Sequence, residues 1–236
     1  MDNRDIVGVL GGMGPAATVD FMSKVIELTG ADSDQQHIPL VVSSMPNIPD
    51  RSAHLLHGSS SPLPALLHRL HQLEKAGATV IVMPCNTAHY WFPQLRMAAT
   101  VEMLNLIEEV VAVAQKAHFS KVGLLATSAT LATLLYQKAL SQTGMECIAP
   151  ESTLQQEVMN SIYLCKSGNT TEARQRLEAP YRFLLQQNIE AIILGCTEIP
   201  IILAEEVLNK PDYFLDSNKI LAQSLVNLYK QKNITI

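Results

Sequence analysis

Short apolar segments alternate along the chain with longer segments whose apolar residues recur at helical spacing. The short apolar runs predict buried strands at 6–10, 39–43, 79–83, 122–126 and 191–194. The helical pattern covers 15–29, 62–76, 103–117, 129–143, 171–187 and 218–230. This alternation predicts an α/β fold in which short parallel sheets are flanked by helices.

The pattern also repeats within the chain. The segment 6–12 matches 121–127, and the segment 80–87 matches 191–198, at offsets of 115 and 111 residues. Two separate pairs at a similar offset predict two similar α/β domains related by a pseudo-twofold. We expect an N-terminal domain of residues 1–102 plus 212–236, with the last helix returning to it, and a C-terminal domain of 103–211.

Composition narrows the class of protein. Among 236 residues, 47% are hydrophobic and 17% charged, and the net charge of -5 contains no run of like charges. These values indicate a globular protein and disfavour nucleic-acid binding. The start of the chain lacks the order of a signal peptide and no apolar run reaches bilayer length, so we expect a soluble, cytoplasmic protein with no membrane partner.

The sequence contains only weak matches to nucleotide-binding and metal-binding motifs. The glycines at 11, 12 and 14 do not form a dinucleotide-binding motif, and no P-loop lysine follows them. The HxxH pairs His54/His57 and His68/His71 lack a third ligand pattern, and the four cysteines contain no CxxC pair. We therefore expect no metal and no disulfide framework, and we expect reduced thiols.

Two of the cysteines stand in matching surroundings. Cys85 lies in Pro84-Cys85-Asn86-Thr87 and Cys196 in Gly195-Cys196-Thr197, each directly after a predicted strand. Ligands of parallel sheets bind beyond the carboxyl ends of strands. If each cysteine also begins a helix, the positive end of the helix lowers its pKa, so that it can exchange protons near neutral pH. Racemisation needs such a pair, one group on each face of the α-carbon.

These residues also resemble a known family. Met83-Pro84-Cys85-Asn86-Thr87-Ala88-His89 and Leu194-Gly195-Cys196-Thr197-Glu198-Ile199-Pro200 resemble the two signatures of the aspartate/glutamate racemase superfamily. The turns at 11–15 and 126–130 are also similar to it. The resemblance implies two α/β domains with the active site between them, a homodimer, and racemisation of a small-molecule amino acid without pyridoxal phosphate or any other cofactor.

The resemblance also implies roles for individual residues. Cys85 and Cys196 are the expected acid/base pair. The residues expected to hold the α-carboxylate and amino group are Asn86, Thr87, Thr127, Thr130 and Thr197, with Gly12 and Met13 lining the pocket floor. Arg51 and Lys166 are similar to the basic residues that aspartate-using members place against the side-chain carboxylate, and a guanidinium binds carboxylate bidentately.

The sequence allows more than one substrate and more than one reaction. Glu198 stands where cell-wall glutamate racemases carry His, and Gly-Gly-Met-Gly stands where they carry Asp-Ser, which favours an aspartate racemase or a broader amino-acid racemase. The same scaffold also fits a maleate-type isomerase, a hydantoin-type racemase or a non-catalytic amino-acid-binding protein. His89 is expected either to contact the Cys85 thiolate or to pack beside Trp91.

Overall fold

The computed structural model describes residues 5–233, and these fall into two compact units. Unit 1 comprises residues 1–109 and 218–236, and unit 2 comprises 110–217. The domain boundaries expected from the sequence were at 102/103 and 211/212. Residues 1–4 and 234–236 of the expected N-terminal domain lie outside the described residues. Each unit is described by itself.

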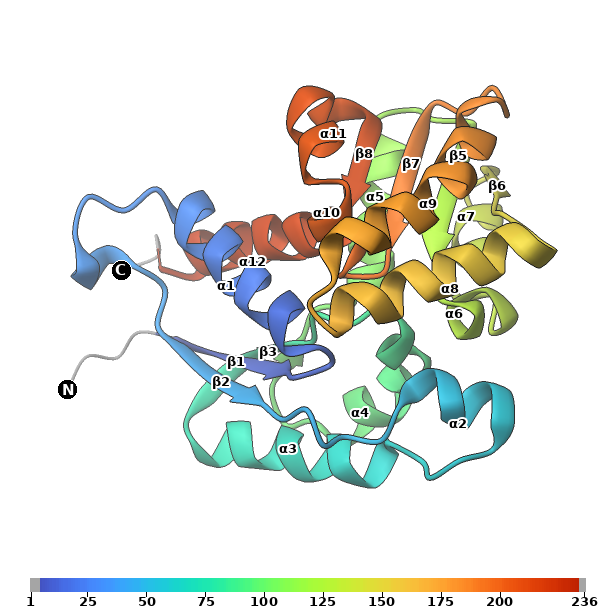
Figure 1. Ribbon diagram of the computed structural model, residues 1–236. Helices are drawn as coiled ribbons and strands as arrows, with labels where there is room; N and C mark the ends of the chain where they lie inside the picture. Colours follow the sequence, from blue (N-terminus) through green and yellow to red (C-terminus); the bar gives the residue numbers. More distant parts are fainter. Residues whose placement is uncertain (1–4, 234–236) are drawn as a thin grey trace. The chain divides into compact units, whose positions relative to one another are not determined.

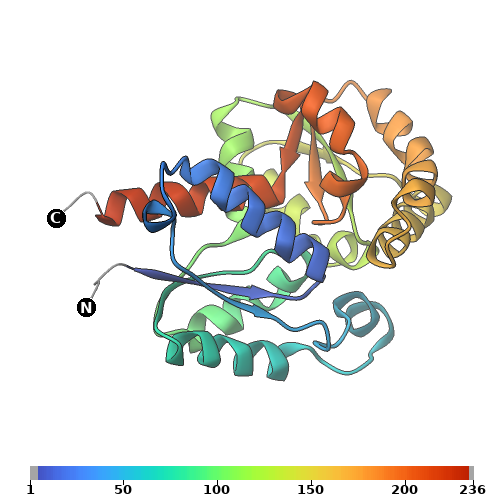
Figure 2. The same cartoon turned by 60° about the vertical axis from the view of Figure 1, so that its left-hand side comes forward.

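Unit 1 is built on a parallel sheet of strand order β2-β1-β3-β4. Its strands are β1 (Ile6–Gly11), β2 (Leu40–Ser44), β3 (Ala78–Val82) and β4 (Glu102–Met103). Its helices are α1 (Pro15–Thr29), α2 (Arg51–His57), α3 (Leu63–Lys75), α4 (Phe92–Ala98) and the long α12 (Ser217–Asn233). Helices α1 and α12 cover one face of this sheet, and α3 and α4 the other (Figures 1 and 2).

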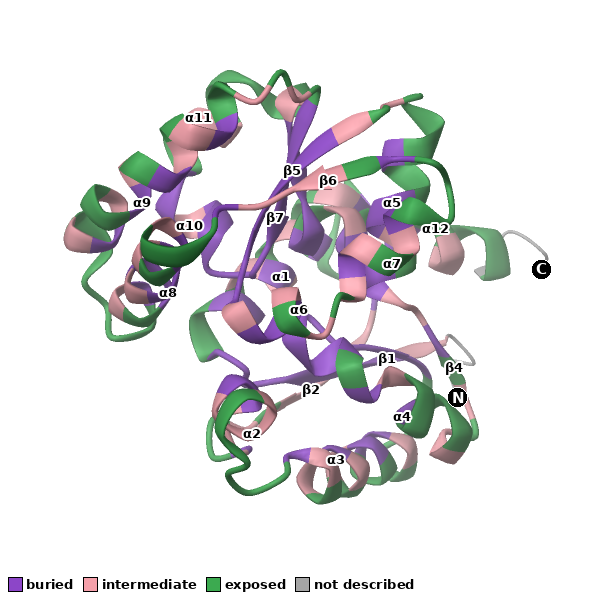
Figure 3. Cartoon of the chain, turned by 90° about the vertical axis from the view of Figure 1, so that its right-hand side faces the viewer, coloured by how far each residue is buried: buried purple, intermediate pink, exposed green. Residues whose placement is uncertain are grey.

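Unit 2 contains a parallel sheet of order β6-β5-β7-β8. Its strands are β5 (Lys121–Ala126), β6 (Glu146–Ile148), β7 (Ala191–Gly195) and β8 (Phe214–Asp216). Helix α5 (Leu106–Lys116) leads into the unit from unit 1. The remaining helices are α6 (Ser128–Ala132), α7 (Leu135–Ser141), α8 (Ser152–Lys166), α9 (Thr170–Leu185), α10 (Ile199–Ile202) and α11 (Ala204–Asn209). Helices α8 and α9 lie on one side of the sheet and α5 and α7 on the other (Figure 3).

The two sheets share one topology. In each, the first strand of the unit pairs with the second on one side and with the third on the other, and the fourth strand pairs with the third. The internal repeat of the sequence thus corresponds to a repeated fold, and the α/β class with two parallel sheets is confirmed. The five expected strands are also present, because each is a short, largely apolar run.

Each unit has its own apolar core. In unit 1, Leu66 and Leu70 of α3 pack with Leu10 and Ile81 of the sheet. In unit 2 the core is formed by buried residues of α8, α9, β5 and β7, among them Val158, Ile162, Leu177, Leu184, Leu125, Ile192 and Leu194. Because side chains of parallel strands are buried on both faces, these strands carry continuous rather than alternating apolar residues.

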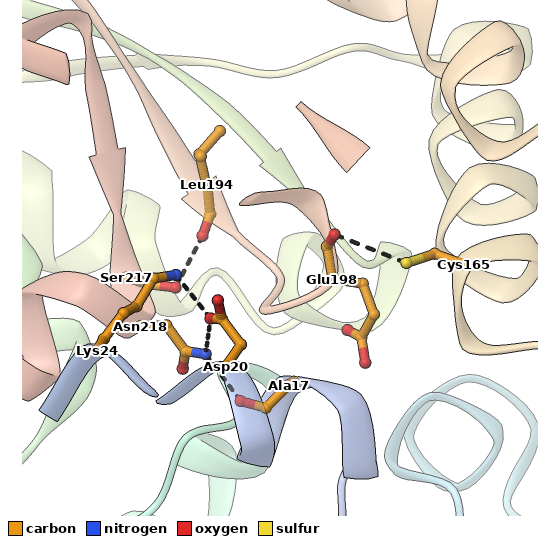
Figure 4. Close-up of polar contacts among 8 residues, drawn as sticks. All are labelled: Ala17, Asp20, Lys24, Cys165, Leu194, Glu198, Ser217 and Asn218. Atoms are coloured by element: carbon orange, nitrogen blue, oxygen red, sulfur yellow. Dashed lines mark hydrogen bonds and ion pairs between the residues drawn. The ribbon is translucent and has the colours of Figure 1, made fainter. Parts of the chain in front are cut away.

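Helix α12 is tied to α1, which precedes it by almost the whole length of the chain. The buried Asn218 amide donates to the carbonyl oxygen of Ala17 at 3.0 Å and to Oδ2 of Asp20 at 2.8 Å (Figure 4). Lys24 pairs with the same carboxylate oxygen at 2.6 Å. Polar contacts of this kind fix how α12 lies against unit 1, because a buried amide without partners is costly.

Two helix predictions need correction. The segment 129–143 is not one helix: Leu134 adopts a left-handed conformation, with φ of 57°, and divides it into α6 and α7. The segment 103–117 begins as strand β4, and its helix starts at Leu106. No described helix is both long and apolar enough to cross a bilayer.

Candidate active site

Cys85 lies just beyond the carboxyl end of β3. The chain leaves the strand through Met83 and Pro84, and the backbone N–H of Cys85 donates back to the carbonyl oxygen of Met83 at 2.8 Å. The side chain is 5% exposed and belongs to the core of unit 1. A 3₁₀ helix, η2 (Thr87–Trp91), follows it. Cys85 therefore precedes a short 3₁₀ helix, which continues directly into α4, where we had expected the start of an α-helix.

His89 holds this loop in place. Its Nδ1 lies 2.8 Å from the carbonyl oxygen of Cys85, and its Nε2 accepts the backbone N–H of Leu106, at the start of α5, at 3.1 Å. The ring stacks on Phe92 at 5.4 Å between centroids. Because Nε2 accepts a hydrogen bond, the proton of the neutral ring is on Nδ1, and this N–H donates a hydrogen bond to the carbonyl oxygen of Cys85. Both ring nitrogens of His89 thus bond backbone groups and not the Cys85 thiolate, which corrects the first of its two expected roles. Packing beside Trp91 stays a prediction.

Burial makes the His89 imidazole a fixed neutral group. The ring is 3% exposed, and burial lowers its pKa to about 4, although the hydrogen bond to Cys85 acts in the opposite direction. Both nitrogens are engaged with backbone groups. His89 is thus suited to position Cys85 and unsuited to exchange protons with a substrate.

Cys196 lies directly after β7, in the corresponding place of unit 2. Gly195 precedes it, where a Cβ would lie 2.7 Å from the side chain of Leu124, so the close packing of β5 on β7 favours glycine. Cys196 is 6% exposed, and its Sγ donates to Oε2 of Glu198 at 2.9 Å. The helix that follows, α10, has four residues.

The expected lowering of the thiol pKa is not found at Cys196. Burial raises its pKa well above the ordinary value, and the neighbouring Glu198 charge raises it further. Lys166 and the backbone N–H of Glu198 act in the opposite direction. One short helical turn supplies little of the dipole that we had invoked, because the field of a helix end grows from many aligned peptides. Burial and the Glu198 charge therefore favour the protonated thiol form of Cys196.

The other residues expected in unit 1 lie on three loops that leave its sheet. Gly12 has φ of 89°, and a Cβ there would lie 2.2 Å from the backbone nitrogen of Met45. Its own N–H donates to Oγ1 of Thr18 at 2.8 Å. Met13 packs in the same core as Cys85, while Asn86 and Thr87 are 2% and 6% exposed.

Arg51 is a buried cation at the first residue of α2. It is 8% exposed, and its Nη1 donates to the carbonyl oxygens of Ile48 at 3.2 Å and Pro49 at 3.1 Å. Among residues 5–233 it forms no ion pair with a carboxylate. Its charge is therefore held in place by the loop without being neutralised by an acidic side chain.

The residues expected in unit 2 gather around the ends of β5 and β7. Thr127 caps α6 by accepting the N–H of Thr130 at 3.1 Å, and the two hydroxyl oxygens lie 2.9 Å apart. Thr197 is 2% exposed. Lys166, in the last turn of α8, is exposed, and its Nζ lies 5.8 Å from the centroid of the Tyr163 ring. It also lowers the pKa values of Cys165 and Cys196, against the larger effect of burial.

Two polar residues at this end of the unit 2 sheet were not predicted. Glu198 is 2% exposed and contacts Cys196, although the sequence had used it merely to separate subgroups. Gln155 of α8 donates from Nε2 to the carbonyl oxygen of Ala126 at 3.0 Å and to Ser128 Oγ at 3.1 Å. Glu198 stands two residues from a candidate cysteine, which was the available signal. Gln155 lies in no motif.

The remaining cysteines are buried or half-buried thiols. Burial raises the pKa of Cys147 to about 12 and that of Cys165 to about 11. The Cys165 thiol faces the backbone oxygen of Glu198 at 3.9 Å (Figure 4). Within the described part of the chain, no three His, Cys, Asp or Glu side chains gather as metal ligands would.

Fold and site together define a class: a duplicated α/β protein in which each half ends an equivalent inner strand on a buried cysteine. Residues 10–225 match the family described as Asp/Glu/hydantoin racemase. The chain belongs to this family and is an amino-acid racemase.

Relatives of known name agree with this assignment. The broad specificity amino-acid racemase RacX of Bacillus subtilis (strain 168) is 31% identical over 229 residues, which cover 95% of this chain and 98% of that protein. The aspartate racemase of Picrophilus torridus superposes with a TM-score of 0.87 at 35% identity, covering 96% of this chain and 94% of that one. Glutamate racemase of Francisella tularensis subsp. tularensis SCHU S4, solved with D-glutamate, shares the fold, with a TM-score of 0.69 at 17% identity and coverage of 99% and 84%.

Proposed function

We propose that this chain interconverts the enantiomers of an acidic amino acid, aspartate first, by two-base proton transfer between Cys85 and Cys196 without a cofactor. The observation that carries the proposal is the equivalence of the two cysteines. Each is buried and follows the third strand of its sheet, β3 or β7, which in both units is the inner strand beside β1 or β5. A duplication that retains a thiol at both strand ends supplies two groups of one kind.

The chemistry requires such a pair. A thiolate on one side takes the α-proton, and the electrons of the broken C–H bond remain on the α-carbon, which becomes planar. The thiol on the other side then returns a proton to the opposite face. A single fixed base cannot readily serve both faces, whereas two groups that change roles with the enantiomer can.

Hydrogen-bond donors near both cysteines suit the common part of an amino acid. Hydroxyl and amide groups stand at 86–87, 127–130 and 197. We assign Asn86, Thr87, Thr127, Thr130 and Thr197 to the α-carboxylate and the amino group, and Gly12 and Met13 to further contacts with the substrate. Donors held by a rigid backbone stabilise the charge that develops as the α-proton leaves.

Arg51 supports an acidic substrate. A buried guanidinium presents five N–H donors, and the described contacts of Arg51 use Nη1 alone, on two backbone carbonyls. A buried cation without an anion is costly. A carboxylate on the substrate side chain would supply that anion through bidentate hydrogen bonds, and Lys166 would add a second positive charge.

A broader substrate range is the second candidate. It is favoured by the similarity to the Bacillus subtilis broad specificity amino-acid racemase, which extends over 95% of this chain. Under this alternative, uncharged amino acids are racemised at rates comparable with that of aspartate.

A panel of single enantiomers in deuterated water, without added cofactor, tests the proposal. We expect both α-deuteration and loss of optical purity, strongest with aspartate or glutamate. Comparable rates with alanine or lysine would favour the broad range. Activity confined to maleate or to a hydantoin would replace the proposal by the corresponding isomerase, and stereospecific binding without α-deuteration would identify a binding protein.

Single substitutions test the pair. Cys85→Ser and Cys196→Ser should each lower racemisation at least about 100-fold, because each removes one acid/base group. Cys147→Ser is the matched control, since this half-buried thiol lies on β6, outside the proposed pair. Full activity of either of the first two variants would contradict two-base chemistry at these thiols.

A further inference from the structure

The carboxyl group of Glu198 is buried beside the Cys196 thiol in an unusual way. One oxygen, Oε2, accepts the thiol hydrogen bond at 2.9 Å. The other, Oε1, is buried and has no hydrogen-bond partner among the described residues. A carboxylate accepts several hydrogen bonds, and leaving part of that capacity unused in a buried place is costly.

A purely structural role accounts poorly for this arrangement. The backbone of the same residue already supports the turn after β7: its carbonyl oxygen accepts the N–H groups of Ile201 and Ile202 at 3.1 and 3.2 Å and faces the Cys165 thiol. The side chain of Glu198 points away from Cys165 and takes no part in these backbone contacts (Figure 4). Its described contact is the thiol that the proposed reaction uses.

We propose that Glu198 is the proton acceptor of Cys196, so that the two side chains share one proton and one negative charge. This inference rests on the proposed racemase function and names a third member of its proton-transfer machinery. Before reaction the pair is a thiol and a carboxylate. When Cys196 acts as base, its proton moves to Glu198, and the pair becomes a thiolate and a carboxylic acid.

The proton balance closes over one turnover. The Cys196 thiolate takes the α-proton as the C–H bond breaks, and the Cys85 thiol gives its proton to the other face. This leaves Cys196 as thiol, Glu198 as acid and Cys85 as thiolate. Transfer of the Glu198 proton to Cys85 through solvent restores the starting state. The opposite enantiomer uses the same states in reverse order.

Shared charge solves a difficulty that burial creates. Burial is the largest cause of the raised Cys196 pKa, so ionising this thiol by release of its proton to bulk water is unfavourable. Transfer to Glu198 leaves the total charge of the pair unchanged. Other ionisable groups act on this pair: Lys166 and Cys165 of α8 and Tyr136 of α7, while Asp216 of β8 acts in turn on Tyr136.

None of these neighbours replaces Glu198. Lys166 favours the thiolate but accepts no proton while charged. The pKa values of Cys165 and Tyr136 are themselves raised by burial, which keeps both groups protonated. Asp216 ends β8 and acts on Tyr136. The described contact to the Cys196 sulfur that can receive its proton is Glu198.

The test compares Glu198→Gln, which keeps the shape but not the charge or the proton affinity, with Glu198→Asp and with Glu205→Gln. Glu205 is exposed on α11 and serves as the matched control for the same chemical change. The first measurement needs no activity. Iodoacetamide alkylation of Cys196 in the full-length protein is followed by peptide mass spectrometry across pH.

We expect the alkylation midpoint of Cys196 in Glu198→Gln to fall by about one pH unit or more, because a negative charge beside the thiol is gone. Glu205→Gln should match the unchanged protein. Racemisation should fall about 100-fold in Glu198→Gln and recover in part in Glu198→Asp. Since enantiomers have equal free energy, kcat/KM must fall equally in both directions, and this equality checks the kinetic data.

Each other outcome overturns the inference. An unmoved Cys196 midpoint in Glu198→Gln shows that the carboxylate does not act on this thiol. A moved midpoint with undiminished racemisation shows that it accepts no catalytic proton, and equal losses in the Asp and Gln variants show a merely structural need for Glu. If the unchanged protein racemises nothing, the proposed function fails, whereas a moved midpoint still establishes the contact between the two groups.

Discussion

The neutral state of His89 makes a quantitative prediction about stability and pH. Burial lowers its pKa from 6.5 to about 4 in the folded chain, a difference of about 2.5 units. At roughly 1.4 kcal/mol per unit, this shift makes the free energy of unfolding about 3 kcal/mol lower below pH 4 than above pH 6.5. The loss occurs as the pH falls from 6.5 to 4, because over that range the unfolded chain takes up a proton on His89 that the folded chain does not.

His89→Gln is the informative perturbation. Glutamine keeps a donor and an acceptor but cannot titrate, so its effect separates hydrogen bonding from protonation. At pH 7.5 the variant should be less stable than the unchanged protein, because its amide reproduces the contacts to Cys85 and Leu106 imperfectly. By pH 4.5 this difference should shrink, or reverse, by a change approaching about 3 kcal/mol.

Urea unfolding followed by tryptophan fluorescence measures the free energy of unfolding with a probe close to His89. Trp91 is the single tryptophan of the chain, is 3% exposed and lies two residues beyond His89 in η2. His68→Gln, at an exposed position on α3, is the matched control and should keep the slope of the unchanged protein. If the unchanged protein and His89→Gln lose stability in parallel between pH 6.5 and 4, His89 is not held neutral by burial and the reasoning is refuted.

Three further substitutions test separate features. Arg51→Gln should raise KM for aspartate about tenfold or more while leaving an accepted uncharged amino acid nearly unaffected, measured by initial rates, since a charge-assisted hydrogen bond to carboxylate is lost. Gly12→Ala should lower the free energy of unfolding by about 1–3 kcal/mol, read from Trp91 fluorescence, because φ at this position is 89° and an added Cβ would overlap the backbone of Met45. Leu134→Gly should raise stability by up to about 1 kcal/mol in thermal unfolding, since it removes the left-handed strain at φ of 57°; an unchanged midpoint would contradict that assignment.

The sequence predicted the elements whose pattern is local. Short apolar runs identified β1, β2, β3, β5 and β7, and the internal repeat predicted two sheets of one kind. It missed β4, β6 and β8, which have two or three residues and are strands because they pair with a neighbour already in place. The break at Leu134 was equally hidden, because no glycine or proline marks it.

The site shows the same limit. Cys85 and Cys196 could be chosen from strand, turn and spacing, but their environments could not. His89 accepts from Leu106, 17 residues further along the chain, and its neutral state follows from that contact and from burial. The raised pKa of Cys196 likewise follows from burial beside Glu198, where the helix-start argument predicted the opposite. Motifs indicated the candidate reactive atoms, and packing determines the direction in which the pKa of Cys196 shifts.

The two halves share a backbone plan while differing in the residues that follow each cysteine. In unit 1, Cys85 precedes Asn86 and Thr87, and its loop is held by a neutral imidazole. In unit 2, Cys196 precedes Thr197 and Glu198, and the thiol contacts a carboxyl group. Duplication accounts for two thiols at equivalent strand ends, because a copied fold copies positions. It does not require equal surroundings, so an amide and a hydroxyl follow the thiol in one half, whereas a buried carboxyl group accepts a hydrogen bond from the thiol in the other. Under the proposed mechanism, this difference gives Cys196 a neighbouring group that can take up its proton.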